Sequence, residues 1–180
     1  MKKLLIYSLL AAVLFGNSGA GCSSNNADDP QPAKLQSLIG KWQLQRAIFE
    51  GVRHDGKIDV RVSEVKKNGG DLQYEFFSDG RLRLTGDPAH GGTRDVRWEL
   101  SAATVLTSGD IEAGKLKIIG DEERKLAQSL GQSGELTYSI VTTRPLSGSN
   151  FSKMSLEIDA TKLEADRYKE IVMYYEYHKL

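Results

Sequence analysis

The chain has 180 residues, 24 Lys and Arg side chains against 24 Asp and Glu, and 39% hydrophobic residues. This length suits a single domain with a sizeable core. The charges balance and the body of the chain holds no basic run, so there is no electrostatic reason to expect a nucleic-acid partner, and none is predicted.

The N-terminus has the pattern of a bacterial secretory signal. Met1-Lys2-Lys3 is a short cationic start, residues 4–15 are mainly apolar but too few for a standard membrane span, and residues 16–21 are small and mostly polar. The only cysteine, Cys22, follows directly. We therefore expect residues 1–21 to be a signal peptide that is removed.

The residues around Cys22 predict a lipid anchor. Gly19-Ala20-Gly21 resembles a lipobox, where bacterial lipoproteins are cleaved and acylated on the new N-terminal cysteine, although that family usually carries Leu at the place of Gly19. The resemblance implies that Cys22 bears fatty acyl chains such as palmitate. The alternative, ordinary secretion, would leave a lone thiol in an oxidising compartment. Ser23 resembles lipoproteins sent to the outer membrane, which predicts an anchor there, on the periplasmic or the cell-surface face.

Between the anchor and the folded domain we expect a tether. Residues 22–34 are rich in Ser, Asn, Asp, Pro and Gln and have no apolar periodicity. Such a segment cannot bury enough surface to order itself. The sequence therefore predicts a lipidated flexible tether over residues 22–34 and one domain over residues 35–180.

The domain opens on an alternating run. Trp42, Leu44, Arg46 and Ile48 are separated by one residue each, so a strand would place them on one face. This period of two predicts the first strand of an all-β barrel.

Further alternating runs follow at short intervals, as in β-sandwiches and barrels. Asp79-Gly80 between two of them predicts a hairpin. The last run is apolar on both sides through its middle, so it would lie inside the sheet and close the barrel against the first strand. We expect an up-and-down antiparallel barrel of about eight to ten strands. After the first, the expected strands are residues 58–62, 72–76, 82–84, 96–100, 104–107, 116–119, 136–140, 154–158 and 168–178.

One helix and two long loops are expected among these strands. Residues 121–130 predict a short helix with Asp121 as its cap and Gly131 as its end, covering an opening or an edge. Residues 86–94 and 145–150 are rich in turn formers and predict exposed loops.

The opening motif resembles a known family. Gly40-Lys41-Trp42 looks like the Gly-x-Trp signature of the lipocalin barrel, and together with the lipoprotein start, residues 76–80 (Phe-Phe-Ser-Asp-Gly), Trp98 and the Tyr-rich last strand it resembles the lipocalin-like lipoproteins of Gram-negative anaerobes. The Thr-Asp-Tyr motif of lipocalins is missing, and no counterpart of the arginine that packs on the opening tryptophan is identified, so the likeness is to a divergent calycin-type barrel. It implies an internal cavity for a small apolar ligand.

The alternation selects candidate residues for the lining of this cavity. The aromatic candidates are equally compatible with plain core packing, because an eight-stranded barrel holds either one small molecule or only side chains. An inward Arg46 would pair with a ligand carboxylate, whereas at a strand end it would extend to water, and we favour the second position. The candidates are Trp42, Arg46, Tyr74, Phe76, Trp98, Tyr138 and Tyr175.

Catalytic motifs are missing from the sequence. His54, His90 and His178 are far apart, and none has the spacing of a metal ligand relative to another His, Cys or carboxylate pair. There is no Gly-x-Ser-x-Gly elbow and no phosphate-binding glycine loop. We expect no enzyme activity, no cofactor and no metal.

Two functions stay open. The first is a lipid-anchored envelope protein that binds a small hydrophobic or amphipathic ligand in its barrel. The second is a non-enzymatic interaction or structural subunit of an outer-membrane complex, with a barrel filled by side chains and with residues 86–94 and 145–150 presented to an envelope protein or a glycan.

Overall fold

The computed structural model describes residues 35–87, 92–145 and 152–180. The predicted signal peptide, Cys22 and the predicted tether lie outside these residues, as do parts of both predicted loops. Along the chain the elements are β1 (Gly40–Arg53), β2 (Ile58–Glu64), β3 (Gln73–Phe76), β4 (Arg81–Asp87), β5 (Gly92–Val105), β6 (Ile111–Ile119), α2 (Asp121–Ser129), β7 (Leu136–Thr143), β8 (Lys153–Asp159), η2 (Thr161–Glu164) and β9 (Tyr168–Lys179).

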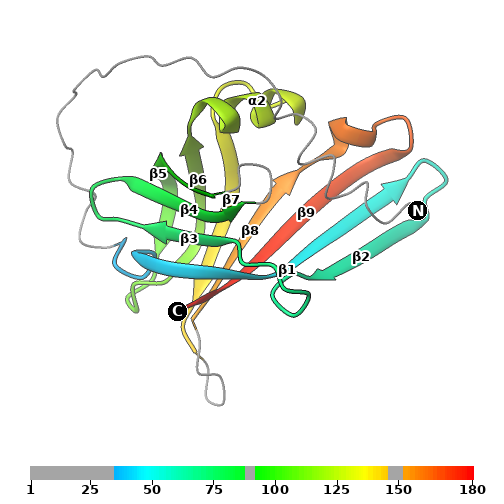
Figure 1. Cartoon of the computed structure of the whole chain (residues 1–180). Coiled ribbons are helices and arrows are strands. Elements are labelled where there is room, and N and C mark those ends of the chain that lie inside the picture. The colour runs from blue at the N-terminus through cyan, green and yellow to red at the C-terminus, as the bar shows by residue number, and fades with distance from the viewer. Residues whose placement is uncertain (1–34, 88–91, 146–151) are drawn as a thin grey trace.

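The strands form one antiparallel sheet that closes on itself. Their order is β2-β1-β3-β4-β5-β6-β7-β8-β9, and β1 pairs in addition with β9. Strands β1 and β3 to β9 therefore make a closed eight-stranded barrel, with α2 at one end (Figure 1). The prediction of an all-β, up-and-down antiparallel barrel with one short helix is confirmed.

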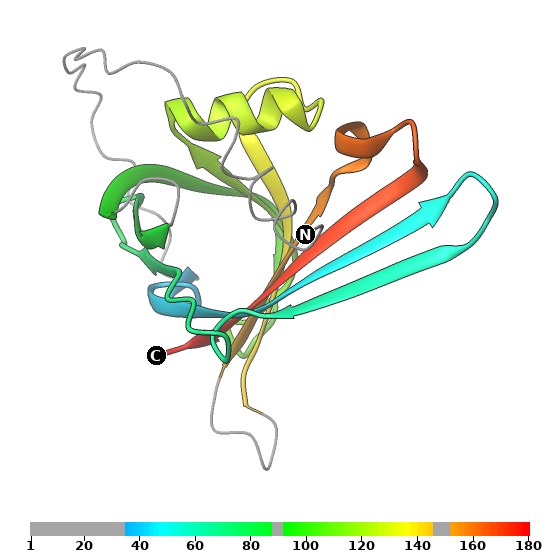
Figure 2. The same cartoon turned by 45° about the vertical axis from the view of Figure 1, so that its right-hand side comes forward.

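Strand β1 takes part both in the closed barrel and in a hairpin with β2. On one edge, residues 40–43 pair with β3 and residues 46–52 pair with β2, while the other edge pairs with β9 over almost its whole length. Strand β2 is therefore outside the closed barrel. The hairpin of residues 46–64, which we call the wing, projects from the barrel beside β9 (Figure 2).

A β-bulge in β1 changes which residues face inward. The register shifts between Leu44, which is opposite Tyr177, and Arg46, which is opposite Glu176. Because consecutive residues of β9 point to opposite faces, Leu44 and Arg46 do so too. The inward row of β1 therefore continues after Leu44 with Ala47, Phe49 and Gly51.

The prediction that Arg46 and Ile48 share the Trp42 row is therefore wrong. The extra residue of the bulge, Gln45, shifts the phase of the alternation by one. Arg46 lies on the outer face, where its Nε donates a hydrogen bond of 2.8 Å to Oε2 of Glu176.

The start of the domain covers one end of the barrel. Trp42 is completely buried, and its indole Nε1 donates a 2.7 Å hydrogen bond to the carbonyl of Leu38. From the last strand, Lys179 lies with Nζ 5.3 Å from the centre of the Trp42 ring and donates to the carbonyl of Ser37. The first turn, the first strand and the last strand are thus locked together at this end.

Three further expectations need correction. Residues 86–94 are not one loop, because β4 continues to Asp87 and β5 begins at Gly92, with Leu84 opposite Arg94. The strands expected at residues 96–100 and 104–107 are a single strand with register shifts between Ser101 and Val105. The helix is confirmed, but its N-cap is the extended Gly120, which makes no side-chain capping bond.

Candidate ligand-binding site

The predicted aromatic residues gather in the barrel interior. Trp42, Phe76, Trp98 and Tyr138 are buried, and Tyr74 and Tyr175 are half-buried. Rings from different strands meet edge to face: the centre of Phe76 lies 5.3 Å from that of Trp98, and the centre of Tyr138 lies 6.2 Å from that of Tyr175. The structure therefore brings six of the seven lining candidates together and excludes Arg46.

The packing differs between two parts of the interior. Phe76 and Trp98 are each 1% exposed and belong to a continuous core. Tyr74, Met173 and Tyr175 also point inward, since their strand partners include the buried residues Trp42, Phe49 and Leu156, yet they are only half-buried. All three side chains pack against the continuous core and still keep accessible surface.

The tyrosine hydroxyls of this region are held neutral. Burial raises the pKa of Tyr138 and of Tyr177 well above the ordinary value, and nearby tyrosines add to the shift. Burial also raises the pKa of Tyr175, whose hydroxyl lies 3.8 Å from the Met173 sulfur. These phenols are neutral at physiological pH and offer hydrogen bonds inside an otherwise apolar space.

The barrel wall opens along one edge of β5. Strand β5 pairs with β4 over residues 92–97 but with β6 only from Arg97 onward. Helix α2 begins at the resulting unpaired edge. A methyl group on Gly120 would lie 3.1 Å from Val96 Cγ1 and 2.3 Å from Glu123 Oε2, so the helix start, the carboxylate and the strand lie close together here.

An ion pair joins the helix to the strand at this edge. Nη1 of Arg94 lies 2.6 Å from Oε1 of Glu123, and the two side chains are 26% and 4% exposed. Arg94 is in the inward row of β5, two residues before Val96 and four before the buried Trp98. Glu123 also contributes to the raised pKa of Tyr138. The pair therefore forms a charged end of the aromatic interior.

An open cleft of about 510 Å³ lies along the same edge. It takes residues from both faces of β5, so it wraps around the unpaired edge of the strand. The lining residues are Arg81, Arg94, Asp95, Val96, Arg97, Ile119, Gly120, Asp121 and Glu123.

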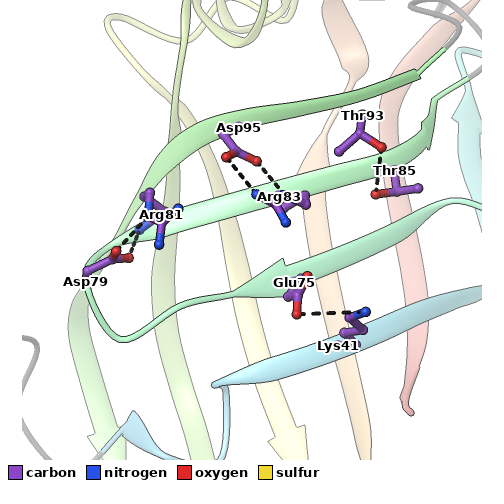
Figure 3. A network of polar contacts seen from close by, with 8 residues as sticks. All are labelled: Lys41, Glu75, Asp79, Arg81, Arg83, Thr85, Thr93 and Asp95. Carbon is purple, nitrogen blue, oxygen red and sulfur yellow. Dashed lines mark hydrogen bonds and ion pairs between the residues drawn. The ribbon is translucent and has the colours of Figure 1, made fainter.

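Most charges outside the barrel here are paired with one another. Arg83 reaches both carboxylate oxygens of Asp95, at 2.8 and 3.1 Å, and Arg81 Nε donates to Asp79 at 2.6 Å (Figure 3). Lys41 and Glu75 extend this outer ladder of ion pairs to β1. Because these partners lie on the surface, the ladder marks the solvent-facing side of the sheet.

Arg94 and Glu123 are not among the predicted site residues. Arg94 lies in the loop expected over residues 86–94, although it continues the alternation of Val96 and Trp98 towards the N-terminus. Glu123 lies in the first turn of the expected helix, where its charge alone suits the position. It is nevertheless four residues before Ala127 and seven before Leu130, and all three are buried on one helix face.

The histidines and possible metal ligands of the described residues form no second site. His54 Nε2 lies 3.1 Å from the carbonyl of Ala165. Among the described residues there is no group of three or more His, Cys, Asp or Glu side chains that would hold a metal ion. Within the same residues, no helix has the length and apolarity that crossing a membrane requires.

Comparisons with protein-family models, with curated proteins and with solved structures found no significant match.

Proposed function

We propose that this chain is a lipid-anchored protein of the cell envelope whose barrel binds a small hydrophobic or amphipathic ligand. One observation carries the proposal: Tyr74, Met173 and Tyr175 face inward and keep accessible surface. A barrel used only as a solid support would gain stability by covering these side chains completely. Accessible rings, a thioether and neutral hydroxyls on the inner face suit a ligand that is mostly apolar.

The charged end of the interior favours an amphipathic ligand over a pure hydrocarbon. Arg94 and Glu123 lie where the wall opens, and Glu123 Oε2 has no hydrogen-bond partner among the described residues. A buried carboxylate oxygen of this kind favours a hydrogen-bond donor beside it. A ligand with an apolar body and a hydroxyl or amide group at one end fits both parts.

The proposed anchor rests on the sequence around Cys22. Metabolic labelling with radioactive palmitate is expected to label the wild-type protein and not the Cys22→Ser variant. A labelled Cys22→Ser protein, or an unlabelled wild type, would contradict the anchor without bearing on ligand binding.

Resemblance to lipocalins lends the proposal further support. A cation on the opening tryptophan is a feature of that family for which the sequence alone offered no candidate. Lys179 lies over the Trp42 ring, from the last strand. The likeness therefore extends to one more contact, although the cation is a lysine.

Ligand binding is tested by placing a larger side chain on the inner face of the barrel. Ala47 is an inward, half-buried residue opposite Tyr175, whereas its neighbour Ile48 points outward. With a fluorescent fatty acid as probe, Ala47→Phe is expected to weaken binding at least tenfold and Ile48→Phe to leave it unchanged. Native mass spectrometry of the purified full chain, with solvent extraction, would identify a co-purified ligand.

The competing function predicts a different result. If the barrel only supports an envelope complex, the wild type binds no probe and carries no extracted ligand under any expression condition. Equal probe binding by the two phenylalanine variants would likewise contradict an interior site, because it would place the probe on the surface. Circular dichroism and thermal unfolding of both variants check that they are folded.

A further inference from the structure

Strand β2 presents an unusual apolar surface. Ile58, Val60 and Val62 are 68%, 56% and 54% exposed, and they alternate on the outer face of the wing. The strand stands at the end of the sheet, so its outer edge pairs with no strand among the described residues. An uncovered edge strand with aliphatic side chains is a template for pairing with another strand.

The direction of the backbone groups of β2 follows from its hairpin. Arg53 N–H donates to the carbonyl of Lys57 at 2.8 Å, and in an antiparallel ladder hydrogen-bonded pairs alternate with non-bonded pairs. Asp59 and Arg61 therefore exchange their backbone hydrogen bonds with β1. The N–H and C=O groups of Val60 and its apolar neighbours point to the outer edge.

The strand is complementary to itself in one antiparallel register. Residues 58–62 read Ile-Asp-Val-Arg-Val, with an acid and a base placed symmetrically about Val60. If Val60 is set opposite Val60 of a second copy, Asp59 is opposite the Arg61 of that copy, and Ile58 is opposite its Val62. Opposite charges and aliphatic pairs directly across an antiparallel pair stabilise it.

The neighbouring registers are repulsive. Centring the pair on Arg61 sets two guanidinium groups face to face, and centring it on Asp59 does the same with two carboxylates. Like charges directly opposite each other destabilise a strand pair. Charge thus favours the register centred on Val60 over the two registers next to it.

We propose that β2 is a dimerisation edge, at which two copies of this chain join their sheets antiparallel about a two-fold axis through Val60. A two-fold axis requires residue i of one copy to meet residue j of the other and the reverse, and the pairing of Asp59 with Arg61 satisfies this requirement. The wing projects from the barrel, so its edge is presented away from the closed wall (Figure 2). The dimer does not depend on the proposed ligand.

Charge reversal in two different copies tests the edge without relying on a single variant. Asp59→Arg places two arginines on the strand, and Arg61→Asp places two aspartates there. Each variant alone opposes like charges across the edge and is expected to be monomeric, whereas an equal mixture pairs arginine with aspartate at every charged position. By analytical ultracentrifugation of the full chain in the Cys22→Ser background, the mass is expected to double for the unaltered edge and for the mixture.

Cysteine cross-linking tests the register. In the same background, Val60→Cys brings two thiols together across a hydrogen-bonded pair, where Cα atoms are about 5.5 Å apart and within disulfide range. Val62→Cys is the matched control, because it lies on the same face but opposite Ile58. Mild oxidation is expected to give a covalent dimer of the Val60→Cys protein and several-fold less of the control.

Three results would overturn the proposal. The first is an unaltered edge that stays monomeric at every concentration, and the second is a mixture that does not recover the dimer. The third is binding of vesicles of anionic phospholipid by monomers that is lost on Val60→Asp, because the apolar row would then face a membrane.

Discussion

Arg94 of β5 and Glu123 of α2 form an ion pair, with Nη1 and Oε1 2.6 Å apart, at the edge where β5 has separated from β6. The carboxylate is buried and the guanidinium is partly covered. The pair therefore holds the helix against a stretch of wall that strand pairing leaves open.

Glu123→Gln is expected to destabilise the protein. It removes the charge that compensates Arg94 in a poorly solvated place, which costs about 2 kcal/mol of unfolding free energy. Chemical denaturation followed by circular dichroism measures this. Asp121→Asn, in the same helical turn but 91% exposed, is the control and is expected to change stability by less than about 0.5 kcal/mol. Equal effects would mean that the pair itself contributes nothing.

Gly51→Ala is expected to loosen the contact between the wing and Tyr168. An added methyl group would lie 2.7 Å from two carbons of the Tyr168 ring, so the ring must move from a buried position. Overpacking of this kind costs about 1–3 kcal/mol. Thermal unfolding should show a lower midpoint for Gly51→Ala and nearly the wild-type midpoint for Glu50→Ala, whose side chain is exposed on the outer face. An unchanged midpoint for Gly51→Ala would contradict this packing.

Tyr168 is expected to make the folding stability of the protein depend on pH, through its contact with Asp59 in the wing. Tyr168 is buried, and its hydroxyl donates a 2.7 Å hydrogen bond to Oδ2 of Asp59. This bond, followed by the nearby arginines, lowers the pKa of Asp59 in the folded state. A lowered pKa stabilises the fold above the unfolded value of about 3.9 and loses that effect as pH falls through the folded pKa.

The measurement compares urea midpoints between about pH 7 and about pH 3, since the unfolded carboxyl titrates near 3.9. Tyr168→Phe is expected to lose less stability over this range than the wild type does, because the hydrogen bond to Asp59 is already gone. Tyr174→Phe makes the same chemical change on the outer face of β9 and should follow the wild-type slope. Parallel curves for all three proteins would show that the hydroxyl does not set the Asp59 pKa.

The interior tyrosines are expected to make the protein sensitive to alkali. Burial raises the folded-state pKa of Tyr138, Tyr175 and Tyr177. Their stabilising effect is complete below the unfolded pKa of about 10 and decreases as pH rises above it. Phenolate absorbance should show these tyrosines ionising only when the protein unfolds, whereas in urea all tyrosines titrate near pH 10. Phenolate formation at pH 10 in the folded protein, by more tyrosines than the exposed ones, would contradict the burial.

Local sequence pattern determined much of the fold. The alternation in β7 and β8 predicts both strands correctly because each has one face in the core and one in water, so neighbouring residues along the chain carry the whole signal. The alternation in β2 predicts the strand but not its surroundings, because its apolar face is exposed. Gly131 likewise marks the end of α2 in the sequence. The bulge in β1 escaped detection because Gln45 changes the phase of the strand only through its pairing with β9, more than a hundred residues away.

By itself, the sequence determined that this protein is an all-β barrel with one short helix, and it selected six of the aromatic residues that meet inside. Only the tertiary structure decided that Arg46 faces outward, that Arg94 and Glu123 close the gap beside β5, and that β2 stands outside the barrel with an unpaired edge. The physical reason is that hydrophobic alternation is a property of adjacent residues. Strand register, ion pairing across elements and the edge of a sheet depend on segments that folding brings together.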